Sequence, residues 1–100
     1  MKTTIKEEAN KYLVTLEGEM DTAAAMEAEE KLQQLYTAGN RDVVIECQQL
    51  EYIASSGLRI LLKILKTVKA NGCNVVLRNV NDDIKEVFRL TGFIDIFAFE

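Results

Sequence analysis

The sequence predicts an α/β protein with a mixed β-sheet of four to five strands and three to four helices, in the order β-β-α-β-α-β-α-β. Three observations support this prediction. Two extended segments near the N-terminus are joined by a short polar pair, as in a hairpin. Two later runs of aliphatic and β-branched residues are typical of buried strands. Segments with helical periodicity alternate with these runs, which favours parallel neighbours and right-handed crossovers.

The first two strands are expected at residues 3–8 and 11–18, with Ala9-Asn10 as the turn between them. In the second segment, more apolar and more polar residues alternate, so the two faces of this strand should differ. Gly18 is expected to end the strand.

Three helices are expected from apolar residues that recur at spacings of three and four. Asp, Thr and Asn side chains at their starts can accept hydrogen bonds from free N–H groups, and Gly or Asn marks their ends. The predicted limits are Asp21 or Thr22 to Gly39-Asn40, Ser56 to Asn71-Gly72, and Asn81 or Asp82 to Gly92.

The remaining strands are expected at residues 42–47, 74–78 and 96–99, with a loop through Gln48, Gln49 and Glu51. Three amphipathic helices are few for covering both faces of a sheet. We therefore expect them to cover one face, or most of it.

The 100 residues fit one domain spanning residues 1–100, and the apolar content of 48% is enough for a core. The net charge of −4 argues against direct nucleic-acid binding and against an anionic membrane surface. Arg59, Lys63, Lys66 and Lys69 recur at helical spacing. A solvated helix face is the simpler interpretation of these residues, and a face that docks a partner is the alternative.

The chain has no histidine and two isolated cysteines, Cys47 and Cys73, which predicts neither a zinc site nor a disulfide framework. We expect buried, reduced thiols, no cofactor and a cytoplasmic location. No signal-peptide segment and no apolar run of about 20 residues is present, so no membrane span is expected.

The turn Ser55-Ser56-Gly57 follows a buried strand and a short loop and begins a leucine-rich helix. A phosphate on a serine there would meet free N–H groups and a partial positive charge. The alternative is that Ser55 or Ser56 only caps the helix and that Gly57 only permits close packing. A nucleophilic serine is not favoured, because no histidine and no Gly-x-Ser-x-Gly elbow is present.

The sequence gives little support for a nucleotide-binding loop or a cation site. The sequence has neither of the two glycine-rich phosphate loops, Gly-x-Gly-x-x-Gly and Gly-x-x-x-x-Gly-Lys-Ser/Thr. Glu17, Glu19 and Asp21 would suit a cation site, but a solvated surface with a helix cap is the favoured interpretation.

Three separated motifs resemble the STAS domain, and more narrowly the bacterial anti-sigma factor antagonists. The first is the segment Leu50–Leu58 after the strand Val43-Val44-Ile45-Glu46. The second is Gly18-Glu19-Met20-Asp21, which resembles the family's Gly-Glu-Leu-Asp. The third is Phe88-Arg89-Leu90-Thr91-Gly92-Phe93, which resembles its Phe-x-x-(Ser/Thr)-Gly ending. The resemblance covers nearly the whole chain and implies a STAS-like mixed sheet.

The resemblance implies a regulatory binding protein of bacterial transcription and signal transduction, not an enzyme. Such proteins bind an anti-sigma factor that is also a serine kinase, which frees the sigma factor. The kinase phosphorylates a serine and releases the antagonist, and a serine phosphatase reverses this. By position the modified residue is Ser55, with Ser56 as second candidate.

One residue departs from the family pattern, because Ala54 replaces the Asp of Asp-Ser-(Ser/Thr)-Gly. The chain would then use a different kinase, rely on Asp21 as the nearby acid, or bind without being modified. The last case corresponds to an unswitched STAS scaffold in a larger signalling assembly. The residues expected to contact the partner, with Leu58 offering its side chain, are Asp21, Thr22, Ala54, Ser55, Ser56, Gly57, Leu58 and Arg59.

Overall fold

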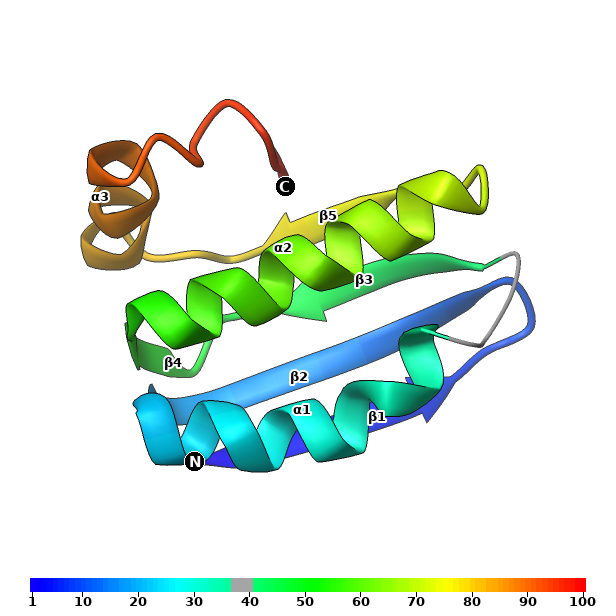
Figure 1. Cartoon of the computed structure of the whole chain (residues 1–100), viewed down its shortest axis with the longest axis horizontal. Coiled ribbons are helices and arrows are strands. Elements are labelled where there is room, and N and C mark those ends of the chain that lie inside the picture. Colours follow the sequence, from blue (N-terminus) through cyan, green and yellow to red (C-terminus); the bar gives the residue numbers. More distant parts are fainter. Residues whose placement is uncertain (37–40) are drawn as a thin grey trace.

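The computed structural model describes residues 1–36 and 41–100, which form a six-stranded sheet and three helices (Figure 1). The α/β class and the mixed sheet are as predicted. The elements in chain order are β1 (Lys2–Glu7), β2 (Lys11–Met20), α1 (Thr22–Tyr36), β3 (Asp42–Glu46), β4 (Leu50–Ile53), α2 (Ser55–Ala70), β5 (Val75–Arg78), α3 (Asp82–Leu90) and β6 (Ala98–Phe99).

The sheet has the order β1-β2-β3-β5-β6, and β4 pairs with β2 outside this path. β1 and β2 form an antiparallel hairpin, whereas all other neighbours are parallel. β4 adds one strand to the predicted order, because the segment expected as a loop pairs with the end of β2. Its burial pattern places two exposed residues between Leu50 and Ile53, so the alternation typical of a strand is missing.

Gly18 does not end β2, contrary to the prediction. The strand continues to Met20, and its register shifts between Gly18 and Glu19. Gly18 has φ of +97°, which a glycine adopts without steric penalty. The result is a bulge that turns the strand from its neighbour β3 toward β4.

Helices α1 and α2 lie on the same face of the sheet, as expected (Figure 1). The core lies between them and the sheet, where alternate strand residues meet the apolar helix stripes. Its central members include Val14, Leu16, Ile45, Leu77, Leu32, Leu61 and Ile64. None of the helices in the described part of the chain is long and apolar enough to cross a membrane.

Helix α3 lies beyond the end of β5 (Figure 1). Aromatic packing holds it in place. The Phe88 ring meets the rings of Phe97 and Phe99 edge to face, with centroids 5.4 and 5.5 Å apart. The final strand was predicted at residues 96–99 but consists of Ala98 and Phe99 only.

The helix limits follow local chemistry. Asp21 and Asn81 cap α1 and α3, because their Oδ1 atoms accept from the N–H groups of Ala24 and Ile84 at 2.8 and 2.9 Å. Gly72, with φ of +80°, follows α2 as predicted. The predicted end of the first helix at Gly39-Asn40 lies outside the described residues.

Candidate functional site

Two helices begin side by side where β2 and β4 end. Asp21 alone connects β2 to α1, and Ala54 alone connects β4 to α2. Because the strands are parallel, with Met20 opposite Ile53, both helices begin at the same end of the sheet (Figure 1). The Ser56 hydroxyl donates to the Thr22 hydroxyl at 3.4 Å and joins the two first turns.

Gly57 allows the first turn of α2 to pack directly on these strand ends. A Cβ atom there would lie 2.9 Å from Cγ1 of Ile53 and 3.0 Å from Sδ of Met20. Such distances leave no room for a side chain. The interpretation that Gly57 permits close packing is therefore confirmed.

The two serines of the turn differ in accessibility. Ser55, the first residue of α2, is exposed, and its hydroxyl makes no hydrogen bond to any described residue. Ser56 is half-buried and donates its hydroxyl to Thr22. A modifying enzyme would therefore reach Ser55 without breaking a contact of the protein.

Neither serine caps α2, so the capping alternative is wrong. The N-cap residue is Ala54, with φ of −83° and ψ of 166°, and it has no side-chain acceptor. The first turn contains no acidic residue. Within residues 1–36 and 41–100, the N–H groups of Ser55, Ser56 and Gly57 have no acceptor. This end of α2 is therefore electropositive and open to an anionic group.

A family model described as the STAS domain matches residues 2–100. The chain belongs to the STAS domain family. The match runs through both strand ends and both helix starts described above. The fold and the resemblance predicted from three separated motifs are therefore confirmed.

Individual relatives place this STAS domain near the anti-sigma factor antagonists. It is 32% identical over 97 residues to a protein of Bordetella bronchiseptica that is named as an anti-sigma factor antagonist, BtrV, covering 97% of this chain and 84% of that protein. It is 31% identical over 85 residues to the anti-sigma-B factor antagonist of Staphylococcus aureus, covering 85% and 79% of the two chains.

The fold likeness extends to solved structures. The Bacillus cell fate determinant SpoIIAA in its phosphorylated form superimposes with a TM-score of 0.77 at 17% identity. The match covers 99% of this chain and 91% of that one. The STAS arrangement is thus retained although few residues are shared.

The structure corrects one predicted contact residue of this STAS domain. Leu58 is 1% exposed and belongs to the core, so its side chain is not offered to a partner. Gly57 is buried and Ala54 half-buried. The exposed residues of the predicted set are Asp21, Thr22, Ser55 and Arg59, and Ser56 is partly exposed.

Asp21 is engaged with its own helix. Its carboxylate accepts from the Ala24 N–H, and the side-chain contact with the serine turn comes from Thr22. Asp21 therefore lies next to the residue that contacts the turn, but its charge already stabilises the start of α1.

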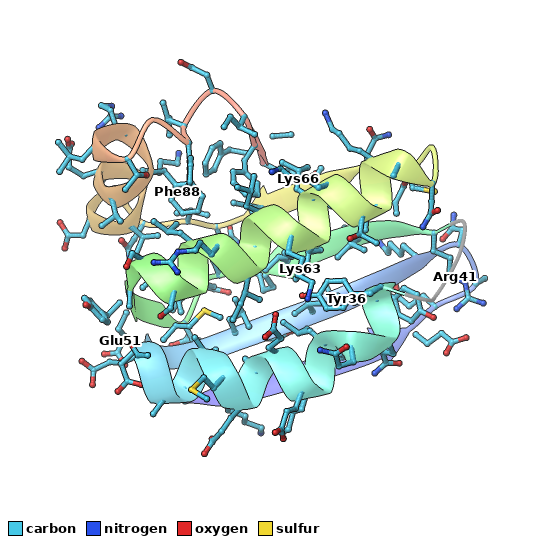
Figure 2. All side chains as sticks on the ribbon, viewed as in Figure 1. Tyr36, Arg41, Glu51, Lys63, Lys66 and Phe88 are labelled. Carbon is cyan, nitrogen blue, oxygen red and sulfur yellow. The ribbon has the colours of Figure 1, made fainter. Side chains whose placement is uncertain are left out.

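Sequence reasoning did not include Tyr52 and Glu51 among the contact residues. Tyr52 is 48% exposed, and Glu51 lies at the same end of the molecule (Figure 2). Both precede Ala54 on β4, directly beside the serine turn. A large exposed aromatic side chain next to a predicted turn was the available signal, since such residues favour interfaces.

The site holds no machinery for metal or nucleophilic chemistry in the described residues. They contain no group of three or more His, Cys, Asp or Glu side chains able to hold a metal ion, so Glu17, Glu19 and Asp21 form no such site. Neither serine hydroxyl bonds to a lysine or a carboxylate in residues 1–36 and 41–100.

Proposed function

We propose that this STAS domain binds an anti-sigma factor and thereby frees a sigma factor, and that phosphorylation of Ser55 ends the binding. The partner is of the serine-kinase type, and a serine phosphatase restores the binding form. The relatives named above, which are called anti-sigma factor antagonists, support the binding role. The chain itself catalyses no step in this proposal.

The observation that supports the phosphorylation switch is the accessibility of the Ser55 hydroxyl. Its hydroxyl, at the first position of α2, is exposed and bonds to none of residues 1–36 and 41–100, whereas the Ser56 hydroxyl donates to Thr22. A kinase can phosphorylate Ser55 without disturbing the contact between α1 and α2. That SpoIIAA, a protein of the same fold, is known in a phosphorylated form agrees with this proposal.

The uncapped start of α2 explains how the free protein tolerates the phosphate. The group adds a charge of about −1.5 to −2 beside N–H groups that have no acceptor in the described part of the chain. The modified protein should therefore remain folded. The phosphate would instead be crowded and desolvated in the complex, and a loss of about 1–3 kcal/mol weakens binding about 5- to 150-fold.

The docking surface in this proposal is formed by both helix starts and the end of β4. Its exposed side chains are those of Asp21, Thr22, Tyr52, Ser55 and Arg59. Ala54 and Gly57 contribute by being small, since they bring the backbone of the turn close to the surface. Tyr52 would supply apolar contact area, because the buried Leu58 cannot.

Phosphorylation is tested by incubating the purified chain with the anti-sigma factor kinases of the source organism and ATP. Mass spectrometry should locate one phosphate on Ser55. Ser55→Ala should abolish it, and Ser56→Ala should retain it. Transfer to Ser56 alone, or to neither serine with any of these kinases, would overturn the site assignment. Treatment with a serine phosphatase should restore partner binding.

The binding consequence is tested with Ser55→Asp. Calorimetry with the anti-sigma factor should show at least fivefold weaker binding. Thermal unfolding should show equal or slightly higher stability, because an acid in the first turn of a helix adds about 0.3–1 kcal/mol. Unchanged affinity would count against the switch. Lower stability would instead attribute the binding loss to a folding defect.

An unswitched STAS scaffold is the second candidate, and Ala54 is the observation that favours it. The family acid that precedes the modified serine is missing here. Ala54→Asp discriminates between the candidates. If the native chain is a switched antagonist, kinases should modify it before any substitution. If only the Ala54→Asp variant is phosphorylated, the native chain is the unswitched module.

A further inference from the structure

The outer side of α2 carries a charge opposite to that of the chain. The net charge of the chain is −4, yet α2 contains Arg59, Lys63, Lys66 and Lys69 and no acidic residue. The positive charge is thus concentrated on one helix of an acidic protein. Such an arrangement creates a local potential that attracts an anionic partner.

Among the described residues, Lys63 is the one basic residue of α2 that forms an ion pair within the fold. Its Nζ lies 3.5 Å from the Glu29 carboxylate and 4.5 Å from the centre of the Tyr36 ring, on the side of α2 that faces α1 (Figure 2). Arg59, Lys66 and Lys69 are exposed and have no carboxylate within 4.0 Å in the described part of the chain. Three cations therefore remain available to a partner.

Beside these cations runs an apolar groove, which we call the α2 groove. Its central depression has a volume of about 580 Å³ and is lined by Leu62, Leu65, Lys66, Lys69, Ala70 and Ile96. Ile96, from the segment before β6, is 45% exposed and forms the wall opposite the helix. Lys66 lies along this groove, on α2 (Figure 2).

Two neighbouring depressions lengthen the groove. One of about 330 Å³ shares Leu62 and Lys66 and extends toward Arg59. The other, of about 480 Å³, shares Leu65, Lys69 and Ile96 and ends at Asp42, whose carboxylate accepts from the Asn74 N–H. From Arg59 to Ala70 the groove follows about three turns of α2, roughly 17 Å.

We propose that the α2 groove docks an acidic amphipathic helix of a partner protein. Leu62 and Ile96 would receive the apolar stripe of that helix. Carboxylates on its flank would pair with Lys66 and Lys69, which are three residues apart, and with Arg59, which lies two turns from Lys66. This is helix-in-groove recognition selected by charge.

Charge and shape together favour a protein helix, rather than a nucleic acid or a membrane, as the occupant of the α2 groove. A nucleic acid or an anionic bilayer would meet a chain whose net charge is −4, offset on α2 by three cations that form no ion pair with the described residues. The apolar depression between α2 and Ile96 matches the stripe of an amphipathic helix, whereas a phosphate backbone gains nothing from it. The short contact predicts a transient complex with micromolar affinity.

The α2 groove meets the docking surface of the serine turn at Arg59, but its central depression does not include that turn. Its central depression lies along residues 62–70, whereas Ser55 and the helix starts lie at the other end of α2. The inference therefore goes beyond the proposed function. Ser55→Asp should leave docking in the groove unchanged.

The experiment uses the full chain labelled with ¹⁵N and two synthetic helical peptides with the same leucine stripe. One peptide carries glutamates on both flanks of the stripe, and the other carries lysines. Chemical shifts should move at Leu62, Leu65 and Ile96 with the glutamate peptide only, with a Kd of about 10–100 µM. Added salt should weaken this binding.

The double substitution Lys66→Glu and Lys69→Glu should weaken binding at least tenfold. A matched pair on β1, Lys2→Glu and Lys6→Glu, changes the net charge equally and should have no larger effect than added salt. Amide spectra of both variants show whether each remains folded.

Three results would overturn the proposal: equal binding of both peptides, shifts confined to the serine turn, or no binding by the glutamate peptide. Vesicles of phosphatidylglycerol serve as the competing probe. If they bind the chain through Lys66 and Lys69 and the glutamate peptide does not, the surface recognises lipid and the proposed helix is wrong.

Discussion

The backbone N–H of Ala54 donates a hydrogen bond of 2.9 Å to the carbonyl oxygen of Met20. This bond holds the residue before α2 against the residue at the end of β2. The Ala54 side chain, in contrast, accepts nothing from the first turn of α2. The tertiary contact thus positions a helix start whose own N–H groups are left without a cap.

Replacing Ala54 by Asp should stabilise the protein. Its backbone is already extended, as an N-cap requires, and a carboxylate there can accept from the free N–H groups of the first turn. We expect the free energy of unfolding to rise by about 0.5–2 kcal/mol, measured by urea titration. Ala54→Asn should give part of the gain, since it caps without charge. A fall in stability would contradict the assignment of Ala54 as the N-cap.

Replacing Gly57 by Ala should destabilise the protein. The added methyl would overlap with Ile53 and Met20, which costs about 1–3 kcal/mol in a packed site. Because alanine has a higher helix propensity than glycine, up to about 1 kcal/mol of this loss is offset, and the expected net loss is about 1–2 kcal/mol. Urea unfolding measures it, and Ser55→Ala is the matched control in the same turn. Equal stability of both variants would show that the side chains at the strand ends move aside at little energetic cost.

The source of this strain can be located with a double-mutant cycle. Ile53→Ala removes the atom that lies 2.9 Å from the added methyl. The substitution at Gly57 should then cost at least about 0.5 kcal/mol less in the Ile53→Ala background than in the native one. Additive losses would place the strain elsewhere.

Replacing Tyr36 by Phe should maintain or raise stability. The ring stacks on Lys63, but its buried hydroxyl has no hydrogen-bond partner among the described residues. Burial, together with the negative charge of Glu29, raises the pKa of Tyr36 to about 12. Removing the unpaired hydroxyl should gain up to about 1 kcal/mol in thermal unfolding. The Tyr36→Leu variant also loses the ring and should be less stable than the Tyr36→Phe variant. Equal stability of the two variants would show that the contact with Lys63 contributes nothing.

Stability should fall at alkaline pH because of Cys47. Burial, and secondarily the charge of Glu46, raises the pKa of this thiol from 9.0 to about 12. Below pH 9 the Cys47 thiol keeps its proton in both the folded and the unfolded form, so its contribution to the free energy of unfolding is fully present there. Between pH 9 and 12 the unfolded form loses the proton first, which lowers stability by up to about 1.4 kcal/mol per pH unit.

Urea titrations at pH 8, 9 and 10 in a Tyr36→Phe background measure this slope, because the raised pKa of Tyr36 would otherwise add to the loss near pH 10. Cys47→Ala should flatten the slope, although it lowers stability at every pH by removing a core side chain. Cys73→Ala is the matched control at a thiol that is only partly buried, and it should keep the native slope. Equal slopes for both variants would assign the alkaline loss to another group.

Local patterns in the chain predicted the elements that depend on local chemistry. The predicted helix starts, Asp21 or Thr22 and Asn81 or Asp82, include the observed N-caps Asp21 and Asn81, because an N-cap depends only on a side chain and the N–H groups of the next turn. The strands around Ile45 and Leu77 were identified because a strand buried on the sheet is apolar throughout. β4 was missed, because its pairing with β2 depends on a distant segment.

The sequence by itself determined the α/β class and the STAS resemblance, and it predicted a site at the serine turn, since periodicity, caps and motifs are properties of neighbouring residues. Only the tertiary structure decided which serine is free, because Thr22 engages Ser56 from another helix. It also decided that Leu58 is buried and that Ile96 stands opposite the basic side of α2. These relations join residues far apart in the chain, and they are set by how the helices pack on the sheet.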